Sequence, residues 1–409
     1  MMKVFLFSLF IVSYLNINAQ NFWAQFSTPE NETCMCLTLD SYDFSYLGTS
    51  HNDGVGGVFL SIDGGSNWDQ IGLANTTIYN IVDTNENSVL VISNQTIYKT
   101  YNYGYDWESK LNAYVRNLCK ISNGDIYAGG WGNDAVYRSR DYGESWTLLL
   151  QLPSNEIAKS IVSNSVGDIF VGTIDFMPST SAGGVYRSID DGTTWENLGL
   201  DYWYVTSIAI NSNGDIFVGR CGHHYTGTGG IFVSYDNGDN WVTLKDDVLV
   251  TSIIINDNDD IFIGCSNLAS LNGGVYKSSD NGNTWELINT GLSNIEVDHL
   301  IISPANYIYT VSRQPYNGNP SSICRSVEPF VNVEDKILIQ NFEIFNYPNP
   351  FNPSTTISFS LNSETAENTE LVIYNLKGQK VKTFPVILSG VEGSAGQHSV
   401  IWNGKDDQG

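Results

Sequence analysis

One eight-residue motif recurs along this chain and constrains its fold more than any other feature. The pattern Ser/Thr-x-Asp/Asn-x-Gly-x-x-Trp occurs six times, as SIDGGSNW, TYNYGYDW, SRDYGESW, SIDDGTTW, SYDNGDNW and SSDNGNTW. The acidic or amide positions of successive copies are separated by 39, 39, 49, 46 and 44 residues. A repeat of this length is typical of one four-stranded blade of a β-propeller. The chain of 409 residues is therefore expected to be a repeat protein rather than one large core.

Each copy of the motif has the chemistry of a tight turn. The Asp or Asn side chain accepts hydrogen bonds from nearby backbone N–H groups, Gly permits a positive φ, and Trp packs back over the hairpin. We therefore interpret the motifs as folding elements rather than catalytic ones. Their structural positions are Ser61, Asp63, Gly65, Trp68, Thr100, Asn102, Gly104, Trp107, Ser139, Asp141, Gly143, Trp146, Ser188, Asp190, Gly192, Trp195, Ser234, Asp236, Gly238, Trp241, Ser278, Asp280, Gly282 and Trp285.

The same pattern of strands surrounds every motif. In the fifth repeat, TSIAINSNGDIFVG contains two alternating strands and a turn, GGIFVS is a third strand, and WVTL is a fourth. If the strands are numbered outward from the propeller axis, the motif joins strands three and four. Six blades can be assigned in this way.

A seventh blade is incomplete in its own place. HLIISPANYIYTVS supplies two strands and SSICRSVEPF a third, without the Gly and Trp of the motif. At the other end of the chain, the segment from Trp23 to Phe26 aligns with the fourth strand that follows the first motif. We expect this N-terminal strand to close blade seven, because closure removes an exposed sheet edge.

These repeats resemble the Asp-box or BNR-repeat superfamily, which includes sialidases, sortilin-type receptors, two-domain xyloglucanases and a photosystem assembly factor. The resemblance covers about residues 22 to 330. It implies an all-β, seven-bladed Asp-box β-propeller over residues 20–332. Because the superfamily hosts unrelated activities, the resemblance does not select one function.

The N-terminus and the charge balance limit where the protein acts. Residues 1–19 combine Lys3, an apolar stretch from Val4 to Leu15, and Ala19, which is typical of a secretory signal peptide. That stretch is shorter than the roughly 20 residues of a membrane-spanning helix, so no transmembrane segment is expected. The 19 basic and 44 acidic residues give a net charge of -25, which repels phosphate backbones and argues against nucleic-acid binding.

Six cysteines are spread over different predicted strands, without a C-x-x-C pair. A cysteine metal framework is therefore not expected, and buried thiols are the simplest interpretation. Export permits disulfides, and two of the cysteines fall at similar places in consecutive repeats, which leaves a bridge between Cys221 and Cys265 open. The six residues are Cys34, Cys36, Cys119, Cys221, Cys265 and Cys324.

The C-terminal part carries a different pattern. After a linker at 333–341 come the strings YPNPFNPSTTI, NLKGQKV and GQHSVIWNGKD. They resemble the type A C-terminal sorting domains of type IX secretion cargo and the Ig-like domains of flagellar hook-capping proteins. The resemblance spans 342–409 and implies a partial Ig-like β-sandwich, a partner in the type IX secretion machinery, and a protein that is secreted or held at the outer-membrane surface. The VILSGVEGS insertion and the end at Gly409 indicate a truncated domain, through either a truncated gene model or a natural terminus.

Candidate ligand-binding residues lie on predicted loops of one propeller face. The loops that join strands two and three share that face with those that join strands four and one, and function concentrates on such loops. Flat aromatic rings there stack on sugars or anchor a protein partner, although the same rings also cover loop bases and strand ends. The candidates are Trp131, Tyr202, Trp203, Tyr204, Arg220, His223, His224 and Tyr225.

No cofactor or metal site is expected. Adjacent histidines such as His223 and His224 usually point apart, and no third ligand follows at a recognisable spacing. The run NDNDD from Asn256 to Asp260 resembles a calcium-binding composition. It occupies the tight turn between strands one and two, so we interpret it as a turn.

Two hydrolase activities of the superfamily are alternatives. A sialidase needs three arginines that converge on a carboxylate. Three of the seven arginines fill a repeated strand position and one lies in a motif turn, namely Arg138, Arg187, Arg325 and Arg140. The others, Arg116, Arg220 and Arg313, belong to blades three, five and seven. A xyloglucanase needs two carboxylates that face each other across a cleft, usually between two propellers, whereas this chain contains one propeller.

The sequence therefore favours an exported propeller that binds a glycan or a protein without catalysis. A glycoside hydrolase, sialidase-like or xyloglucanase-like, and a passive structural or adhesive surface protein are the alternatives. No residue is assigned a catalytic role.

Overall fold

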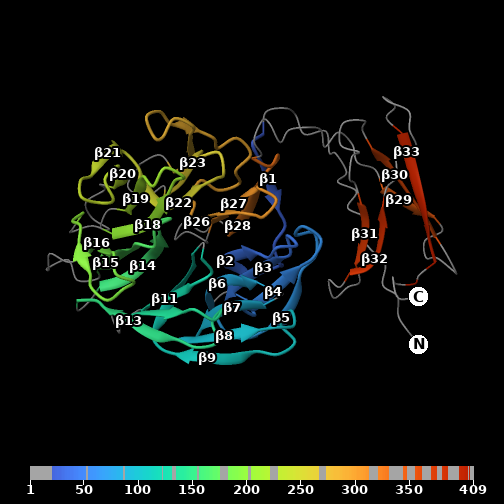
Figure 1. Cartoon of the computed structure of the whole chain (residues 1–409), viewed down its shortest axis with the longest axis horizontal. Helices are drawn as coiled ribbons and strands as arrows, with labels where there is room; N and C mark the ends of the chain where they lie inside the picture. Colours follow the sequence, from blue (N-terminus) through green and yellow to red (C-terminus); the bar gives the residue numbers. More distant parts are fainter. Residues whose placement is uncertain are drawn as a thin grey trace. The chain divides into compact units, whose positions relative to one another are not determined.

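The computed structural model contains seven four-stranded antiparallel sheets arranged as the blades of a β-propeller (Figure 1). In the propeller the structure describes residues 21–330, except 52–53, 86–87, 122, 131–134, 154–155, 176–182, 201–203, 222–228, 267–272 and 313–320. In the C-terminal part it describes 344–347, 355–361, 370–374, 380–385, 396–403 and 405. The predicted signal peptide, 1–19, and the predicted linker, 333–341, lie outside the described residues. All secondary-structure elements of the described residues are strands, so the all-β, seven-bladed prediction is confirmed.

The blades follow one another along the chain, and in each of the first six the innermost strand comes first. Blades one to three consist of β2 (Thr33–Leu39), β3 (Ser45–Ser50), β4 (Gly57–Ser61), β5 (Asp69–Gly72); β6 (Ile78–Asn85), β7 (Ser88–Ser93), β8 (Thr96–Thr100), β9 (Glu108–Asn112); and β10 (Val115–Lys120), β11 (Ile126–Gly130), β12 (Ala135–Ser139), β13 (Thr147–Gln151). Blades four to six consist of β14 (Glu156–Ser163), β15 (Ile169–Asp175), β16 (Gly184–Ser188), β17 (Glu196–Asn197); β18 (Tyr204–Ile210), β19 (Ile216–Cys221), β20 (Gly230–Ser234), β21 (Val242–Lys245); and β22 (Leu249–Ile255), β23 (Ile261–Ser266), β24 (Gly274–Ser278), β25 (Glu286–Leu287).

Blade seven combines strands from both ends of the propeller. Its first three strands are β26 (His299–Ile302), β27 (Ile308–Ser312) and β28 (Ser322–Ser326), and its outer strand is β1 (Trp23–Phe26). β1 and β28 pair antiparallel, with Trp23 opposite Ser326. Trp23 is 1% exposed, and its indole N–H donates to the carbonyl of Ile288 in blade six at 2.5 Å. The first strand of the ring is therefore anchored in two blades that are synthesised last.

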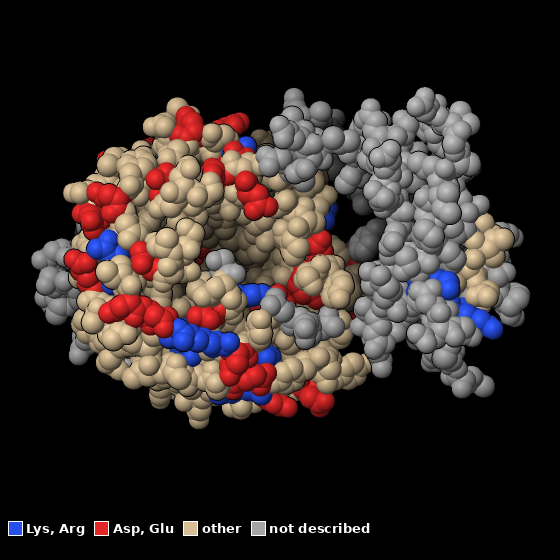
Figure 2. All heavy atoms as spheres, viewed as in Figure 1, with Lys and Arg blue, Asp and Glu red and all other residues tan. Residues whose placement is uncertain are grey.

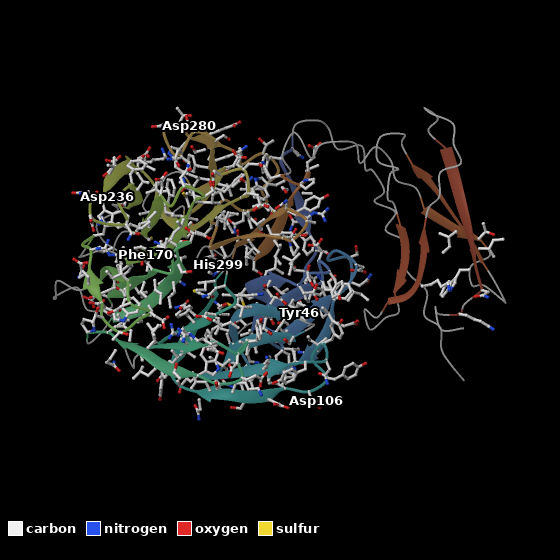
Figure 3. The ribbon with its side chains drawn as sticks, viewed as in Figure 1. Tyr46, Asp106, Phe170, Asp236, Asp280 and His299 are labelled. Carbon is white, nitrogen blue, oxygen red and sulfur yellow. The ribbon has the colours of Figure 1, made fainter. Side chains whose placement is uncertain are left out.

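The Asp-box turns have the hydrogen bonds that their sequence predicts. In all six, the Ser or Thr hydroxyl accepts the N–H of the motif glycine at 2.7–2.9 Å. In the first box, Asp63 accepts the N–H of Asn67 at 2.9 Å, and the φ of Gly65 is 83°. Hydrogen bonds from Thr194 lower the pKa of Asp190 in the same way as in several other boxes. The boxes lie toward the outside of the ring, as the labels of Asp106, Asp236 and Asp280 show, whereas His299 lies near its centre (Figure 3).

The box tryptophans differ in their partners: Trp195 donates to the carbonyl of Gly192 in its own turn at 3.1 Å, as predicted, whereas others reach the preceding blade. Trp68 donates to the carbonyl of Ser27 at 2.9 Å, and Trp107 donates to that of Ile71 at 3.3 Å. Both acceptors belong to the outer strand of the preceding blade or to the residue after it. In these two boxes the indole therefore links neighbouring blades.

A cation one residue before the box also links neighbouring blades. Lys99 donates to the carbonyl of Tyr142 in the box of blade three at 2.7 Å. In the same way Arg138 contacts the carboxylate of Asp191 at 2.6 Å, and Arg187 donates to the carbonyl of Asn237 at 2.6 Å. The interpretation of this repeated basic position as structural is confirmed for these residues.

The inner strands pack closely against the second strands of the preceding blades. At Gly172 in β15, a Cβ atom would lie 2.4 Å from Cγ1 of Val205 in β18. The φ of Gly172 is one that other residues also adopt. Glycine is needed here because the next blade approaches too closely for a side chain. Ser160 adds a polar contact at the same boundary, because its hydroxyl accepts the N–H of Ile208 at 3.0 Å.

The cysteines and the acidic run have structural roles. All six cysteines are free thiols, so the thiol interpretation is confirmed and the bridge between Cys221 and Cys265 is not formed. Burial raises the pKa of Cys221 to about 11. In the NDNDD run, Asn256 accepts the N–H of Asp260 at 2.8 Å, which confirms the turn between β22 and β23.

The C-terminal strands form a compact unit of their own. One antiparallel sheet has the order β29 (Ile344–Tyr347), β30 (Thr355–Leu361), β33 (Gly396–Trp402), and a hairpin pairs β31 (Glu370–Tyr374) with β32 (Lys380–Pro385). Two antiparallel sheets are compatible with a β-sandwich. The Ig-like and truncated character of this part stays a prediction.

Candidate functional site

The predicted ligand-binding residues are only partly described. Trp131, Tyr202, Trp203, His223, His224 and Tyr225 lie outside the described residues. Tyr204 and Arg220 lie in adjacent pairs at the start of β18 and the end of β19, where Tyr204 is opposite Cys221 and Val205 is opposite Arg220. Their assignment as ligand contacts stays a prediction.

Tyr204 and Arg220 differ in accessibility. Tyr204 is half-buried, and burial together with the nearby charge of Asp175 raises its pKa. Arg220 is 7% exposed, and its guanidinium lies 4.7 Å from the ring centroid of Phe232. Burial lowers the pKa of Arg220 to about 10. Tyr204 is therefore the more accessible of the two for a ligand.

An arginine and a tyrosine that sequence reasoning did not select come together on the same face. The inner strands β6 and β10 each contain a β-bulge, between Ile78 and Asn80 and between Val115 and Asn117. A bulge leaves one residue out of the ladder and changes the direction of its side chain. The two extra residues are Tyr79 and Arg116, and the guanidinium lies 3.5 Å from the tyrosine ring centroid. Stacking of this kind holds a guanidinium in a fixed orientation.

A pocket of about 170 Å³ lies beside this pair and is lined by Gln95, Tyr114, Val115 and Arg116. It lies next to a short connection on this face, because only Asn94 and Gln95 separate β7 from β8. Both residues have positive φ, 48° and 67°, as in a type I′ hairpin turn. Blade two therefore presents only a two-residue turn between its second and third strands.

Several features of this pocket suit ligand binding. Tyr114 is 54% exposed and offers an aromatic face, and the Gln95 amide is both donor and acceptor. Lys159, at the corresponding bulge of blade four, lies 3.4 Å from Oδ1 of Asn117. Cations thus occupy the bulges of two neighbouring inner strands in a chain with a net charge of -25. Figure 2 shows the ring hollowed at its centre.

Corresponding bulge residues in blades five and six have structural partners. Thr206 donates to the carbonyl of Val250 at 2.6 Å, and Thr251 donates to that of Val297 at 2.5 Å. The first contact joins β18 to β22, and the second joins β22 to the segment that leads into β26. At the same bulge positions of blades two and three, Tyr79 and Arg116 instead stack on each other.

Two described carboxylates near this face hold the fold together. Glu156, 1% exposed, accepts hydrogen bonds from Thr173 at 2.9 Å and Tyr186 at 3.0 Å. Glu296 accepts one from Ser266 at 2.5 Å. Burial raises the pKa of Asp40, but this carboxyl belongs to the β2–β3 turn at the opposite end of its blade, where it accepts two backbone N–H groups.

The arginines do not share one partner. Arg116 stacks on Tyr79 and Arg220 on Phe232, in blades three and five, while Arg313 lies outside the described residues. Among the described side chains, no three His, Cys, Asp or Glu residues are grouped so that they would hold a metal ion. Within the same described set, no helix has the length and apolar character needed to cross a membrane.

Comparison with known proteins decides the role of the C-terminal part. A family model described as a secretion system C-terminal sorting domain matches residues 346–392. The chain carries a type IX secretion sorting domain. This domain implies interaction with the type IX machinery and secretion to the cell surface or the medium. No curated protein matches the chain.

Solved structures are similar to the propeller at low sequence identity. YCF48 bound to D1 peptide has 16% identity and a TM-score of 0.56, covering 75% of this chain and 97% of that one. YCF48 from Cyanidioschyzon merolae has 12% identity and a TM-score of 0.55, covering 74% and 98%. The GH74 xyloglucanase from Xanthomonas campestris has 14% identity and a TM-score of 0.55, covering 76% and 54%, so the chain spans about half its length. These likenesses show the fold alone.

Proposed function

We propose that this type IX secretion cargo is a non-catalytic binding protein that holds a glycan or a protein on the loop face of its propeller. The observation that carries the proposal is the pocket at blades two and three, where Arg116 is stacked on Tyr79 beside the exposed Tyr114. A fixed guanidinium, an amide and an accessible ring are the groups that anchor ligands at protein surfaces. The proposal also includes the half-buried Tyr204 as a second candidate contact on this face.

Both ligand classes suit this fold. One similar structure was solved with a peptide bound, and another is a xyloglucanase, whose substrate is a polysaccharide. The described carboxylates Glu156 and Glu296 are engaged in hydrogen bonds within the propeller. This arrangement supports binding rather than hydrolysis.

The test is a binding screen with the full mature chain on glycan and peptide arrays, run beside an assay for released reducing sugars. Two double variants, Tyr114→Ala with Arg116→Gln and Trp203→Ala with Tyr204→Ala, are expected to weaken binding of the selected ligand at least about tenfold, because such anchors dominate interface energetics. Tyr235→Ala, at an exposed tyrosine in the box of blade five, is the matched control and should bind normally.

Three results would contradict the proposal. Turnover of a glycan by the wild-type chain would overturn the non-catalytic assignment. Unchanged binding in both double variants would exclude the loop face as the site. Absence of any saturable ligand would favour a passive structural role.

A further inference from the structure

The Asp-box of blade two contains tyrosines that its turn does not need. Tyr105 is 88% exposed and directly follows the motif glycine. The other five boxes carry polar residues at this position, namely Ser66, Glu144, Thr193, Asp239 and Asn283. The turn forms equally well with those residues, so folding does not explain an exposed aromatic ring here.

Further aromatic rings continue from this box toward blade one. The ring centroids of Tyr42 and Phe44 are 6.0 Å apart, and those of Phe44 and Tyr103 are 6.3 Å apart. In blade four the position of Phe44 is held by Asp168, which accepts a hydrogen bond from Asn237 of the next box at 2.9 Å. The contact between Phe44 and Tyr103 replaces that polar link. Tyr42, 50% exposed, is not needed for it.

Tyr101 of the same box contacts the box of blade three. The hydroxyl of Tyr101 bonds both carboxylate oxygens of Glu144 at 2.7 Å, and Nζ of Lys99 lies 4.8 Å from the Tyr101 ring centroid. Lys99 also donates to the carbonyl of Tyr142. Tyr101 and Tyr142 are 44% and 49% exposed. These contacts fix Tyr101 before any ligand arrives, which reduces the entropic cost of binding.

The lysines around these tyrosines are paired with carboxylates. Lys99 and Lys110 pair with Glu144 at 2.6 and 2.8 Å, and Lys110 also pairs with Glu108 at 2.9 Å. At the next turn, Lys120 pairs with Asp83 at 3.2 Å. These three lysines are therefore paired, while Asp40, Asp43 and Asp106 add further carboxylates beside the same rings. The region carries an excess of negative charge, so an anionic ligand would be repelled, whereas a neutral one would not.

We propose that these rings, the tyrosine platform, bind a neutral polysaccharide chain; the platform comprises Tyr42, Phe44, Tyr101, Tyr103, Tyr105 and Tyr142. Rigid aromatic rings bury the apolar C–H faces of sugars at small entropic cost, while phenol and carboxylate oxygens accept hydrogen bonds from sugar hydroxyls. The platform is built from box turns and a strand-one-to-two turn, at the opposite end of the blades from the pocket at Arg116. It is therefore a second site, independent of the proposed function.

The test is affinity electrophoresis of the full mature chain in native gels that contain hydroxyethyl cellulose, glucomannan or polygalacturonate. The two neutral polysaccharides should retard the wild-type chain, and polygalacturonate should not. Tyr42→Ala with Tyr105→Ala should weaken retardation at least about tenfold, since both rings are exposed anchors. Raising the salt from about 0.05 to about 0.5 M should change the retardation less than about twofold, because no charge pairs are formed.

Matched variants separate this site from the one on the loop face. Tyr235→Ala removes a tyrosine that is 55% exposed in the box of blade five and should not change retardation. In the Tyr114→Ala, Arg116→Gln background, adding Tyr42→Ala and Tyr105→Ala should still weaken retardation at least about tenfold, because the two sites lie at opposite ends of the blades. Lack of retardation by both neutral polysaccharides, equal retardation of the Tyr42/Tyr105 variant, or loss of binding at high salt would each overturn the proposal.

Discussion

Replacing Trp23 with alanine tests whether the first strand of the chain holds the ring closed. Trp23 is 1% exposed and packs with Phe262, Val275 and Ile288 of blade six. Truncation of a buried Trp costs about 3–5 kcal/mol, including the cavity that remains. The Ile288 carbonyl also loses its indole donor, which adds about 1 kcal/mol. We therefore expect the free energy of unfolding to fall by about 4–6 kcal/mol.

Guanidinium denaturation of the mature chain, followed by far-UV circular dichroism, measures this loss. The matched control is Gln25→Ala, because Gln25 lies in the same strand with an exposed side chain. This control should change the free energy of unfolding by no more than about 0.5 kcal/mol. A loss of less than about 1 kcal/mol for Trp23→Ala, or equal losses for both variants, would refute the closing role of the strand.

Three further perturbations probe contacts between and within blades. Gly172→Val places side-chain atoms against Val205, where even a Cβ would lie at 2.4 Å, and should lower the denaturation midpoint through a loss of about 1–3 kcal/mol. Arg187→Met removes the link to blade five and should cost about 1 kcal/mol at low salt, less at high salt, because the partner carboxylates are exposed. Burial raises the pKa of Asp141, but hydrogen bonds led by Ser145 outweigh it and lower the value to about 2, from 3.8 for the free side chain. The ionised Asp141 carboxylate therefore stabilises the fold above about pH 4, and this contribution is lost as the pH falls toward 2. Urea denaturation midpoints should drop over this pH window, and the drop should be smaller for Asp141→Asn.

The fold was predictable because its information is local and repeated. Each box encodes a turn within eight residues, and the strands around it alternate with the same spacing in every blade. The outer strand of blade seven was also predictable, since the segment from Trp23 to Phe26 matches the strands that follow the boxes, and the structure pairs it with β28. The contact from Trp68 to Ser27 was missed, because no local pattern shows which blade a side chain reaches.

The candidate site was less accessible to sequence reasoning. Tyr79 and Arg116 lie far apart in the chain and meet only because two bulges direct them toward each other. A bulge leaves little trace in an alternating pattern, since it resembles a shift of one residue. One signal was available in the sequence: only Asn94 and Gln95 separate two strand patterns, which indicates a very short loop on this face of the propeller.

The pairing of β1 with β28 also sets the order in which the ring is assembled. Trp23 and Ser326 are separated by about 300 residues, and closing such a loop costs about 5 kcal/mol of chain entropy by its length dependence alone. The strand that leaves the ribosome first must therefore wait, unpaired, until the last blade exists. Because the sorting domain follows that blade directly, the ring becomes complete only when the export signal is about to be finished.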